Sequence, residues 1–330
     1  MSADTSAAAI DTVAVIGAGS IGIAWTIVHA CAGLRVRLYE RDPQLRDAAL
    51  AEVALKLDDL TDVGLVAETS AAVLERITVW DSVADALVGA GYVQECVVED
   101  LDVKRAMFAE LDRLADPSVV LASSTSTIMA SRFAEDLPGR ERCLVVHPGN
   151  PPYILRVAEI VPAAFTAPWA IELTRNLLTR VAIAPVLLDR EIEGFVFNRL
   201  QGALLREAYC LVRDGIISAA DIDTLVRDGL GRRWSVIGPF TTSELNTRGG
   251  LRRHGQVIGP VYARLGMERA NENPWTTETI ETVANEIEQQ LPHPTWEENV
   301  RERDRAMIRL SALLKLLDNP LARRASTPTP

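Results

Sequence analysis

The stretch VIGAGSIG, residues 15–22, decides the fold of this 330-residue chain. Its glycines have the spacing G-x-G-x-x-G, directly after the β-branched run TVAVI and directly before the helical pattern SIGIAWTIVHAC. The spacing alone is a weak signal, but a strand before it and a helix after it predict a dinucleotide-binding turn. The first glycine permits the tight turn, and the second lets the backbone approach a pyrophosphate at the helix N-terminus. The expected cofactor contacts of this turn are Gly17, Gly19, Ser20, Ile21 and Gly22.

The next expected strand, RVRLYE, identifies the dinucleotide. It ends at Glu40, which lies near the offset of ~20 residues at which an acidic residue binds the ribose hydroxyls. A carboxylate there repels a 2′-phosphate, so the sequence favours NAD over NADP. Arg41 is also a candidate cofactor contact and leaves this preference open, because a neighbouring arginine can accommodate the phosphate.

The first half of the chain alternates strands with helices. Further strands are predicted at ITVW, YVQECVV, VVLASS, RCLVVHP, AEIVP and IAPVLL, and a helix at DVKRAMFAELDRLA. Such alternation is typical of βαβ units and a mainly parallel sheet. We therefore predict an α/β fold, with a Rossmann-type NAD-binding domain over residues 1–190.

Near residue 190 the sequence pattern changes from alternating strands and helices to mainly helices. A long amphipathic pattern begins near Gly194 and is predicted to end at Gly215. SAADIDTLVRDG follows, with Ser218 as the expected N-cap and Gly229 as the expected stop. Most of the remainder has a helical pattern. We predict an all-α substrate and dimerisation domain over residues 191–330.

Composition excludes several classes of protein. The net charge of −11 disfavours nucleic acid as a partner. No apolar run reaches the ~18 residues of a membrane span, so no membrane partner is expected. The four cysteines are widely spaced, as expected for free thiols in the cytoplasm. No histidine or cysteine cluster has ligand spacing, so we predict no metal site.

Polar residues follow two strands and open one helix, where ligands of α/β sheets bind. They lie in SSTST, HPGNPPYILRVAE and EGFVFNR. Oxidation of an alcohol by NAD without a metal needs a base and groups that hold the developing carbonyl. His147 suits the base, and Glu159 can orient it if the chain reverses through Asn150 and two prolines.

Each of these residues also has an ordinary structural explanation. His147 is more often a surface or structural histidine, and Glu159 an edge-strand charge. Ser126 could cap the following helix, and Asn198 could be a polar group on a helix surface. Their joint occurrence after a dinucleotide turn favours the functional interpretation.

Together, GAGSIG, ECVVEDLDVK, SSTST, HPGNPPYILRVAE and GFVFNRL resemble the 3-hydroxyacyl-CoA dehydrogenase family over residues 12 to 250, and most of all its lambda-crystallin and L-gulonate 3-dehydrogenase branch. The resemblance implies catalytic roles for Ser126, His147, Glu159 and Asn198. It implies cofactor contacts for Glu99, Lys104 and Ser124. Ser124 stands where the fatty-acyl enzymes have asparagine, and the crystallin-like branch also has serine there.

The resemblance also bears on the substrate. Arg233 falls on an arginine shared by the crystallin-like branch and bacterial carnitine dehydrogenases, and such a fork suits a substrate carboxylate. Trp234 and Asn150 are further candidate substrate contacts. Arg156 and Arg232 would disfavour a cationic substrate if they faced the pocket.

These implications predict an NAD-dependent dehydrogenase that oxidises the 3-hydroxyl of a small hydroxy acid, with L-gulonate or a related sugar acid first. Carnitine and 3-hydroxyacyl-CoA are the alternative substrates. A non-catalytic, crystallin-like NAD-binding protein is the alternative from another class. Homodimers are usual among the proteins resembled, so a homodimer is expected.

Overall fold

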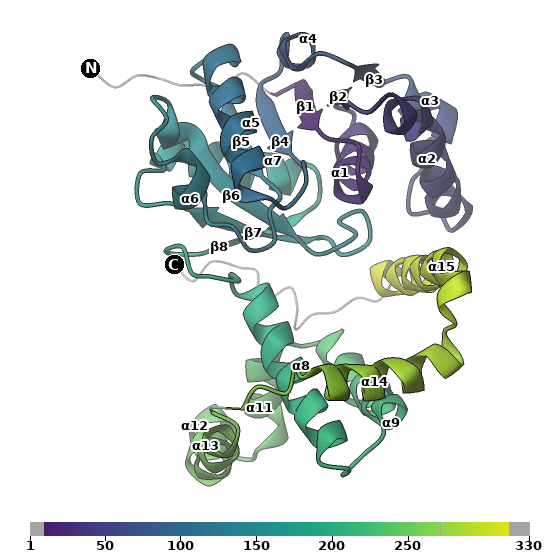
Figure 1. Ribbon diagram of the computed structural model, residues 1–330, viewed down its shortest axis with the longest axis vertical. Coiled ribbons are helices and arrows are strands. Elements are labelled where there is room, and N and C mark those ends of the chain that lie inside the picture. The colour runs from purple at the N-terminus through teal and green to yellow at the C-terminus, as the bar shows by residue number, and fades with distance from the viewer. Residues whose placement is uncertain (1–9, 271, 317–330) are drawn as a thin grey trace. The chain divides into compact units, whose positions relative to one another are not determined.

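The first half of the chain forms one eight-stranded sheet in the computed structural model, which describes residues 10–270 and 272–316 (Figure 1). The strand order is β3-β2-β1-β4-β5-β6-β7-β8, and every neighbouring pair is parallel except β6 and β7. The strands are β1 (Thr12–Ile16), β2 (Arg35–Tyr39), β3 (Ile77–Trp80), β4 (Tyr92–Glu95), β5 (Val120–Ser123), β6 (Cys143–Pro148), β7 (Val157–Pro162) and β8 (Ala184–Leu187).

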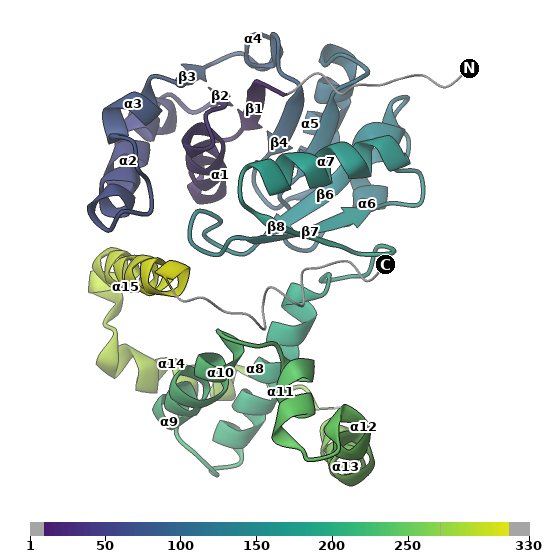
Figure 2. The ribbon, with the colours of Figure 1, turned by 180° about the vertical axis from the view of Figure 1, so that it is seen from behind.

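Helices cover both faces of this sheet. They are α1 (Ser20–Cys31), α2 (Pro43–Asp62), α3 (Ser70–Leu74), α4 (Val83–Leu87), α5 (Leu101–Leu114), α6 (Ala130–Ala134) and α7 (Pro168–Arg180). One apolar core joins the sheet to α1, α2 and α7, and a second joins it to α4, α5 and α6. Figure 1 shows α5 in front of the sheet, and Figure 2, the view from behind, shows α7 in front of the opposite face. Strands covered on both faces explain the nearly continuous apolar runs in the sequence.

The antiparallel pair β6 and β7 reverses the chain at one end of the sheet. Residues 149–156 connect the two strands, and His147 lies directly opposite Glu159 in the register. The predicted return strand AEIVP is therefore confirmed. The connection includes a cis peptide bond between Asn150 and Pro151.

The second half is helical. Its elements are α8 (Phe197–Arg213), α9 (Ala219–Thr224), a π-helical segment (Leu225–Gly231), α10 (Arg232–Trp234), α11 (Pro239–Asn246), α12 (Gly250–Val257), α13 (Gly259–Glu268), α14 (Thr277–Gln290) and α15 (Trp296–Leu316). Gly215 follows α8 with a φ of 67°, and the Ser218 side chain caps α9, both as predicted. The prediction that Gly229 ends a helix is wrong. Its φ is not positive, and the helical turns continue through it to Trp234.

The predicted fold class is confirmed, a Rossmann-type sheet followed by a helical domain. The first compact unit comprises residues up to Arg199 together with Asp304–Ala312, so a short segment of α15 belongs with the sheet. In this segment Ile308 is 2% exposed within the core formed with α1, and Arg305 donates to Asp59 Oδ1 at 2.9 Å. The domain boundary near residue 190 remains a prediction. Within the described ranges, no helix has the length and apolarity needed to cross a membrane.

We expect Ile308→Ala to lower the free energy of unfolding of the first unit by about 2–5 kcal/mol, because it removes a buried side chain from a packed core. Leu310→Ala is the matched control on the same helix, since Leu310 is 50% exposed and its truncation should change stability by less than about 0.5 kcal/mol. Urea unfolding followed by fluorescence measures both. Equal effects of the two variants would contradict the packing of α15 on the sheet unit.

Candidate active site

The three glycines of the turn after β1 have three different surroundings. Gly17 has a φ of 107°, and a Cβ there would lie 2.8 Å from the main-chain oxygen of Cys96. A Cβ on Gly19 would have no heavy atom within 4 Å, which leaves that side of the turn open. A Cβ on Gly22 would lie 1.8 Å from Gly17 O, so α1 packs directly on the turn. These surroundings fit a tight turn, close approach by a pyrophosphate and close helix packing.

The N-terminus of α1 and the end of β2 complete this cradle. No side chain caps α1 within the described part of the chain, and Ser20 is exposed, so the first-turn N–H groups face outward. The Glu40 carboxylate is 8% exposed and is held by Ala18 N at 2.7 Å and Asp42 N at 2.9 Å. It therefore lies beside the turn, where an adenosine ribose would bind. The next residue, Arg41, is exposed.

His147 and Glu159 form a buried pair across β6 and β7. Nδ1 of His147 lies 2.8 Å from Glu159 Oε2, and the side chains are only 7% and 6% exposed. The predicted contact is therefore present in the structure. A histidine that donates from Nδ1 keeps Nε2 as its basic nitrogen.

The other Glu159 oxygen binds the start of α8. Oε1 accepts from Val196 N at 2.8 Å and from Phe197 N at 3.0 Å. Burial raises the pKa of Glu159, but the hydrogen bonds from His147 and these N–H groups outweigh it and lower the pKa below its ordinary value. The carboxylate is thus ionised and fixed at both oxygens.

Phe195 shapes this arrangement. It is fully buried, has a φ of 52°, and its ring centroid lies 5.4 Å from that of His147. The left-handed conformation is unusual for an aromatic residue and turns the next two N–H groups toward Glu159. Phe197 packs on the imidazole edge-on at 6.1 Å.

Glu99 organises the turn after β5. Its Oε1 accepts from Ser126 N at 2.9 Å, Thr127 N at 3.0 Å and Thr125 Oγ1 at 2.6 Å. Burial raises the pKa of Glu99, but these hydrogen bonds and the charge of Lys104 outweigh it and lower the pKa. Ser126 is exposed at the tip of this turn. It does not cap the next helix, because Met129 occupies the cap position of α6.

Beneath this turn lies a fully buried ion pair. Lys104 Nζ is 2.9 Å from Glu95 Oε1 and 3.7 Å from Glu99 Oε2, and the Glu95 and Lys104 side chains are 0% and 1% exposed. Glu95 also accepts from Ser123 Oγ at 2.5 Å. Lys104 therefore contacts two carboxylates of the chain, and its predicted contact with the cofactor remains a prediction. Ser124 is 8% exposed and accepts from Gln94 Nε2 at 2.7 Å.

The structure joins Asn198 to Ser126. Asn198 lies in the first turn of α8, and its Nδ2 donates to Ser126 O at 2.7 Å. The helix start that fixes Glu159 therefore also holds the turn organised by Glu99. The four residues predicted to be catalytic thus form two contacting pairs at the carboxyl ends of β5 and β6 and the start of α8.

Three further residues are predicted substrate contacts. Asn150 is exposed in the connection between β6 and β7. Arg233 and Trp234 belong to α10 in the second compact unit, with exposed side chains. Their roles stay predictions. Arg156 lines a cavity with α1 and the turn from α7 to β8, on the side of the sheet opposite to His147.

Residues 12–192 match the NAD-binding domain of 3-hydroxyacyl-CoA dehydrogenase, and residues 194–289 match its C-terminal domain. The chain belongs to the 3-hydroxyacyl-CoA dehydrogenase family. It is accordingly an NAD-dependent oxidoreductase, and the expectation of NAD and of an enzyme is confirmed. Within the described ranges, no group of three or more histidine, cysteine, aspartate or glutamate side chains could hold a metal ion.

Several known proteins are similar to this chain over most of its length. A lambda-crystallin homolog of Bos taurus is 41% identical over 76% of this chain and 81% of its own length. An L-carnitine dehydrogenase of a Pseudomonas species is 34% identical over 94% of each chain. A solved NAD⁺-dependent dismutase, 5-formyl-3-hydroxy-2-methylpyridine-4-carboxylic acid 5-dehydrogenase, has a TM-score of 0.80 at 25% identity over 94% of this chain and 100% of its own. The lambda-crystallin resemblance is therefore confirmed.

The sequence did not reveal Glu95, Phe195 or Thr125 as parts of the site of this family member. Glu95 stands within a strand pattern, where a charge gives no sign of its buried partner. Phe195 reads as an ordinary apolar residue at the start of a helix. The only available signal was the glycine before it, Gly194, whose φ of 74° begins the left-handed turn.

Two glycine substitutions separate packing from cofactor approach. Gly22→Ala should lower thermal stability by about 1–3 kcal/mol, because its Cβ would overlap Gly17 O. Gly19→Ala should keep the parental unfolding temperature but weaken NADH binding about tenfold or more, because its Cβ occupies the open side of the turn. Thermal unfolding and NADH fluorescence titration measure the two effects. An unaltered affinity in the Gly19 variant would show that the cofactor does not lie on this turn.

Proposed function

We propose that this protein oxidises the 3-hydroxyl of a small hydroxy acid to the 3-keto acid, with L-gulonate or a related sugar acid as the leading substrate. Bound NAD supplies the hydride acceptor. The single observation that carries the proposal is the His147 and Glu159 pair, buried beside the start of α8 at a 2.8 Å separation. Oxidation of an alcohol needs such a base, whereas NAD binding alone does not.

In this mechanism His147 Nε2 takes the hydroxyl proton as the hydride leaves C3. The Glu159 carboxylate holds the other ring nitrogen and stabilises the positive charge that develops on the imidazole. Two main-chain N–H groups prevent Glu159 from following the histidine if the ring rotates. Phe195 and Phe197 limit that rotation further, because both rings pack on the imidazole.

Ser126 and Asn198 hold the substrate oxygen in the proposal. Ser126 is exposed at the tip of the Glu99 turn, and Asn198 reaches the same turn from α8. Hydrogen-bond donors fixed before the reaction stabilise developing carbonyl polarity without reorganisation. The buried Glu95 and Lys104 pair keeps Glu99, and with it Ser126, in place.

For substrate choice, we assign the carboxylate to Arg233, with Trp234 and Asn150 as further contacts. The exposed guanidinium of Arg233 is available to a ligand, and a guanidinium fork matches a carboxylate. L-carnitine is the second candidate, supported by the L-carnitine dehydrogenase that is 34% identical over 94% of the chain. Because Arg156 lines a cavity on the opposite face of the sheet, it no longer disfavours a cationic substrate.

We further propose a homodimer formed through the helical unit. Few of its described apolar residues are buried, among them Cys210, Ala219 and Pro274. Large apolar side chains are instead exposed, such as Phe240 at 76%, Met267 at 69% and Leu200 at 66%. Apolar surface on this scale marks a protein interface.

A cytoplasmic location is part of the proposal. The four cysteines are all free thiols, which suits a reducing compartment. Burial raises the pKa of Cys31 to about 11 and that of Cys143 to about 12, so these thiols are poorly reactive.

His147→Gln should bind NADH like the parent protein but lose about 10²–10⁴-fold in kcat, because it removes the base and keeps a polar side chain. The measurement is NADH formation at saturating hydroxy acid, beside an NADH titration. His254→Gln, on α12, is the matched control and should keep full turnover. Unchanged turnover in the His147 variant would contradict the role of His147 as the base.

Arg233→Met distinguishes the substrate classes. It should raise KM for a free carboxylate by about tenfold or more and leave oxidation of an acyl-CoA nearly unchanged, because a thioester has no carboxylate. The assay is a screen of NAD reduction with L-gulonate, carnitine, 3-hydroxybutyrate and 3-hydroxybutyryl-CoA. Failure of all four to yield NADH would favour the non-catalytic, crystallin-like alternative.

A further inference from the structure

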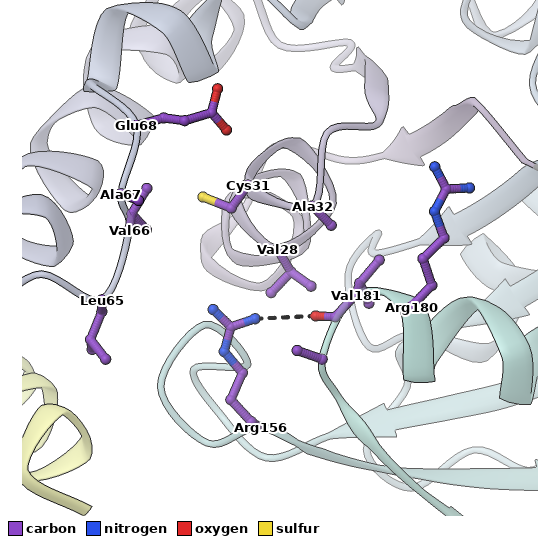
Figure 3. Close-up of a pocket in the computed structure, with 11 residues that line it drawn as sticks. Val28, Cys31, Ala32, Leu65, Val66, Ala67, Glu68, Arg156, Arg180 and Val181 are labelled. Atoms are coloured by element: carbon purple, nitrogen blue, oxygen red, sulfur yellow. Dashed lines mark hydrogen bonds between the residues drawn. The ribbon is translucent and has the colours of Figure 1, made fainter. Parts of the chain in front are cut away.

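A cavity of about 340 Å³ lies in the first compact unit beside the C-terminal end of α1 (Figure 3). Four segments enclose it: α1, the connection between α2 and α3, the residues just before β7, and the turn from α7 to β8. The lining residues that matter here are Val28, Cys31, Leu65, Glu68, Arg156 and Arg180.

The sheet separates this cavity from the His147 pair. Val28 and Val181 line the cavity and belong to the core that joins the sheet to α1 and α7. His147 packs instead on Phe195, which belongs to the core on the other face. A ligand in the cavity would therefore bind apart from the proposed catalytic centre.

Arg156 is the feature that calls for a ligand. Its side chain is partly buried, and burial lowers the pKa of its guanidinium. Within the described part of the chain its hydrogen bond is a long one, from Nη1 to Val181 O at 3.4 Å, and no carboxylate pairs with it. Figure 3 shows the guanidinium directed toward Val28 and Cys31. A cation removed from water without an anion is costly, so such groups are normally paired.

The other polar groups of the lining do not neutralise Arg156. Glu68 accepts from Arg76 Nη1 at 3.0 Å and also from Arg76 Nη2, and these bonds lower the pKa of Glu68. Its charge is therefore balanced by Arg76. The Arg180 guanidinium donates to Ile10 O, and the Cys31 thiol is neutral because burial raises its pKa to about 11.

We propose that this cavity is a binding site for a small organic monocarboxylate, with the carboxylate on Arg156 and the apolar body against Val28, Leu65 and Val181. The planar guanidinium fork matches a carboxylate with two parallel hydrogen bonds. The aliphatic walls select an organic anion rather than inorganic phosphate, which has no apolar part to bury. The volume is enough for a ring or a short chain.

The test uses 4-bromobenzoate as the probe with the full chain and saturating NAD⁺. Anomalous diffraction from bromine locates the bound probe in soaked crystals, and calorimetry gives its dissociation constant. We expect a bromine peak in the cavity with the carboxylate within hydrogen-bond distance of Arg156. 4-Bromobenzyl alcohol, a neutral analogue, should bind at least about tenfold more weakly.

Three variants assign the interaction. Arg156→Met should weaken binding by at least about tenfold and remove the bromine peak from the cavity. Arg175→Met is the matched control, since Arg175 is a half-buried arginine of α7 that pairs with Glu172, and it should bind like the parent. Ala67→Phe keeps Arg156 but fills the rim from an exposed position, and it should also lose the peak.

The Ala67 variant decides the question if Arg156→Met does not fold. Loss of the peak in Arg156→Met, or in Ala67→Phe where Arg156→Met does not fold, supports the site if Arg175→Met retains the peak. A bromine peak only beside His147, no peak at all, or an undiminished cavity peak in Arg156→Met overturns the proposal.

Discussion

The antiparallel pairing of β6 with β7 is the constraint on which the proposed chemistry depends. A parallel sheet would send the chain away from His147 after Pro148, and no residue twelve positions later could return to it. The reversal places Glu159 opposite His147 on the same face. Because the start of α8 then binds the second oxygen of Glu159, the histidine, the carboxylate and the helix form one rigid assembly.

The carboxylates around this assembly have different tasks. Glu159 orients an imidazole, whereas Glu99 gathers the N–H groups of the turn that carries Ser126. Glu95 binds the end of β5 through Ser123 Oγ, and it pairs with Lys104, whose ammonium also lies near Glu99. A buried ion pair of this kind contributes little net stability, but removal of one partner strongly destabilises the protein. Its value here is the fixed position of Glu99.

Local patterns predicted much of the fold and of the site. The alternation of apolar strands and amphipathic helices predicted the sheet. The predicted strand ends indicated the polar site residues, because strand ends also follow from local periodicity. Gly229 shows the limit: the sequence predicted a helix stop, but only a positive φ makes glycine a stop, and here φ is not positive. The return of α15 to the sheet unit had no local signature either, since it depends on Ile308 finding a distant core.

The sequence by itself determined the glycine turn, the acidic residue after β2 and the residues proposed to handle the proton, because these depend on residue type and short spacing. Only the tertiary structure decided which groups touch. It put Lys104 on Glu95, turned Arg156 away from His147 and fixed Glu159 through a left-handed turn at Phe195. Those outcomes depend on burial and on backbone conformation across distant segments, and no local pattern encodes either.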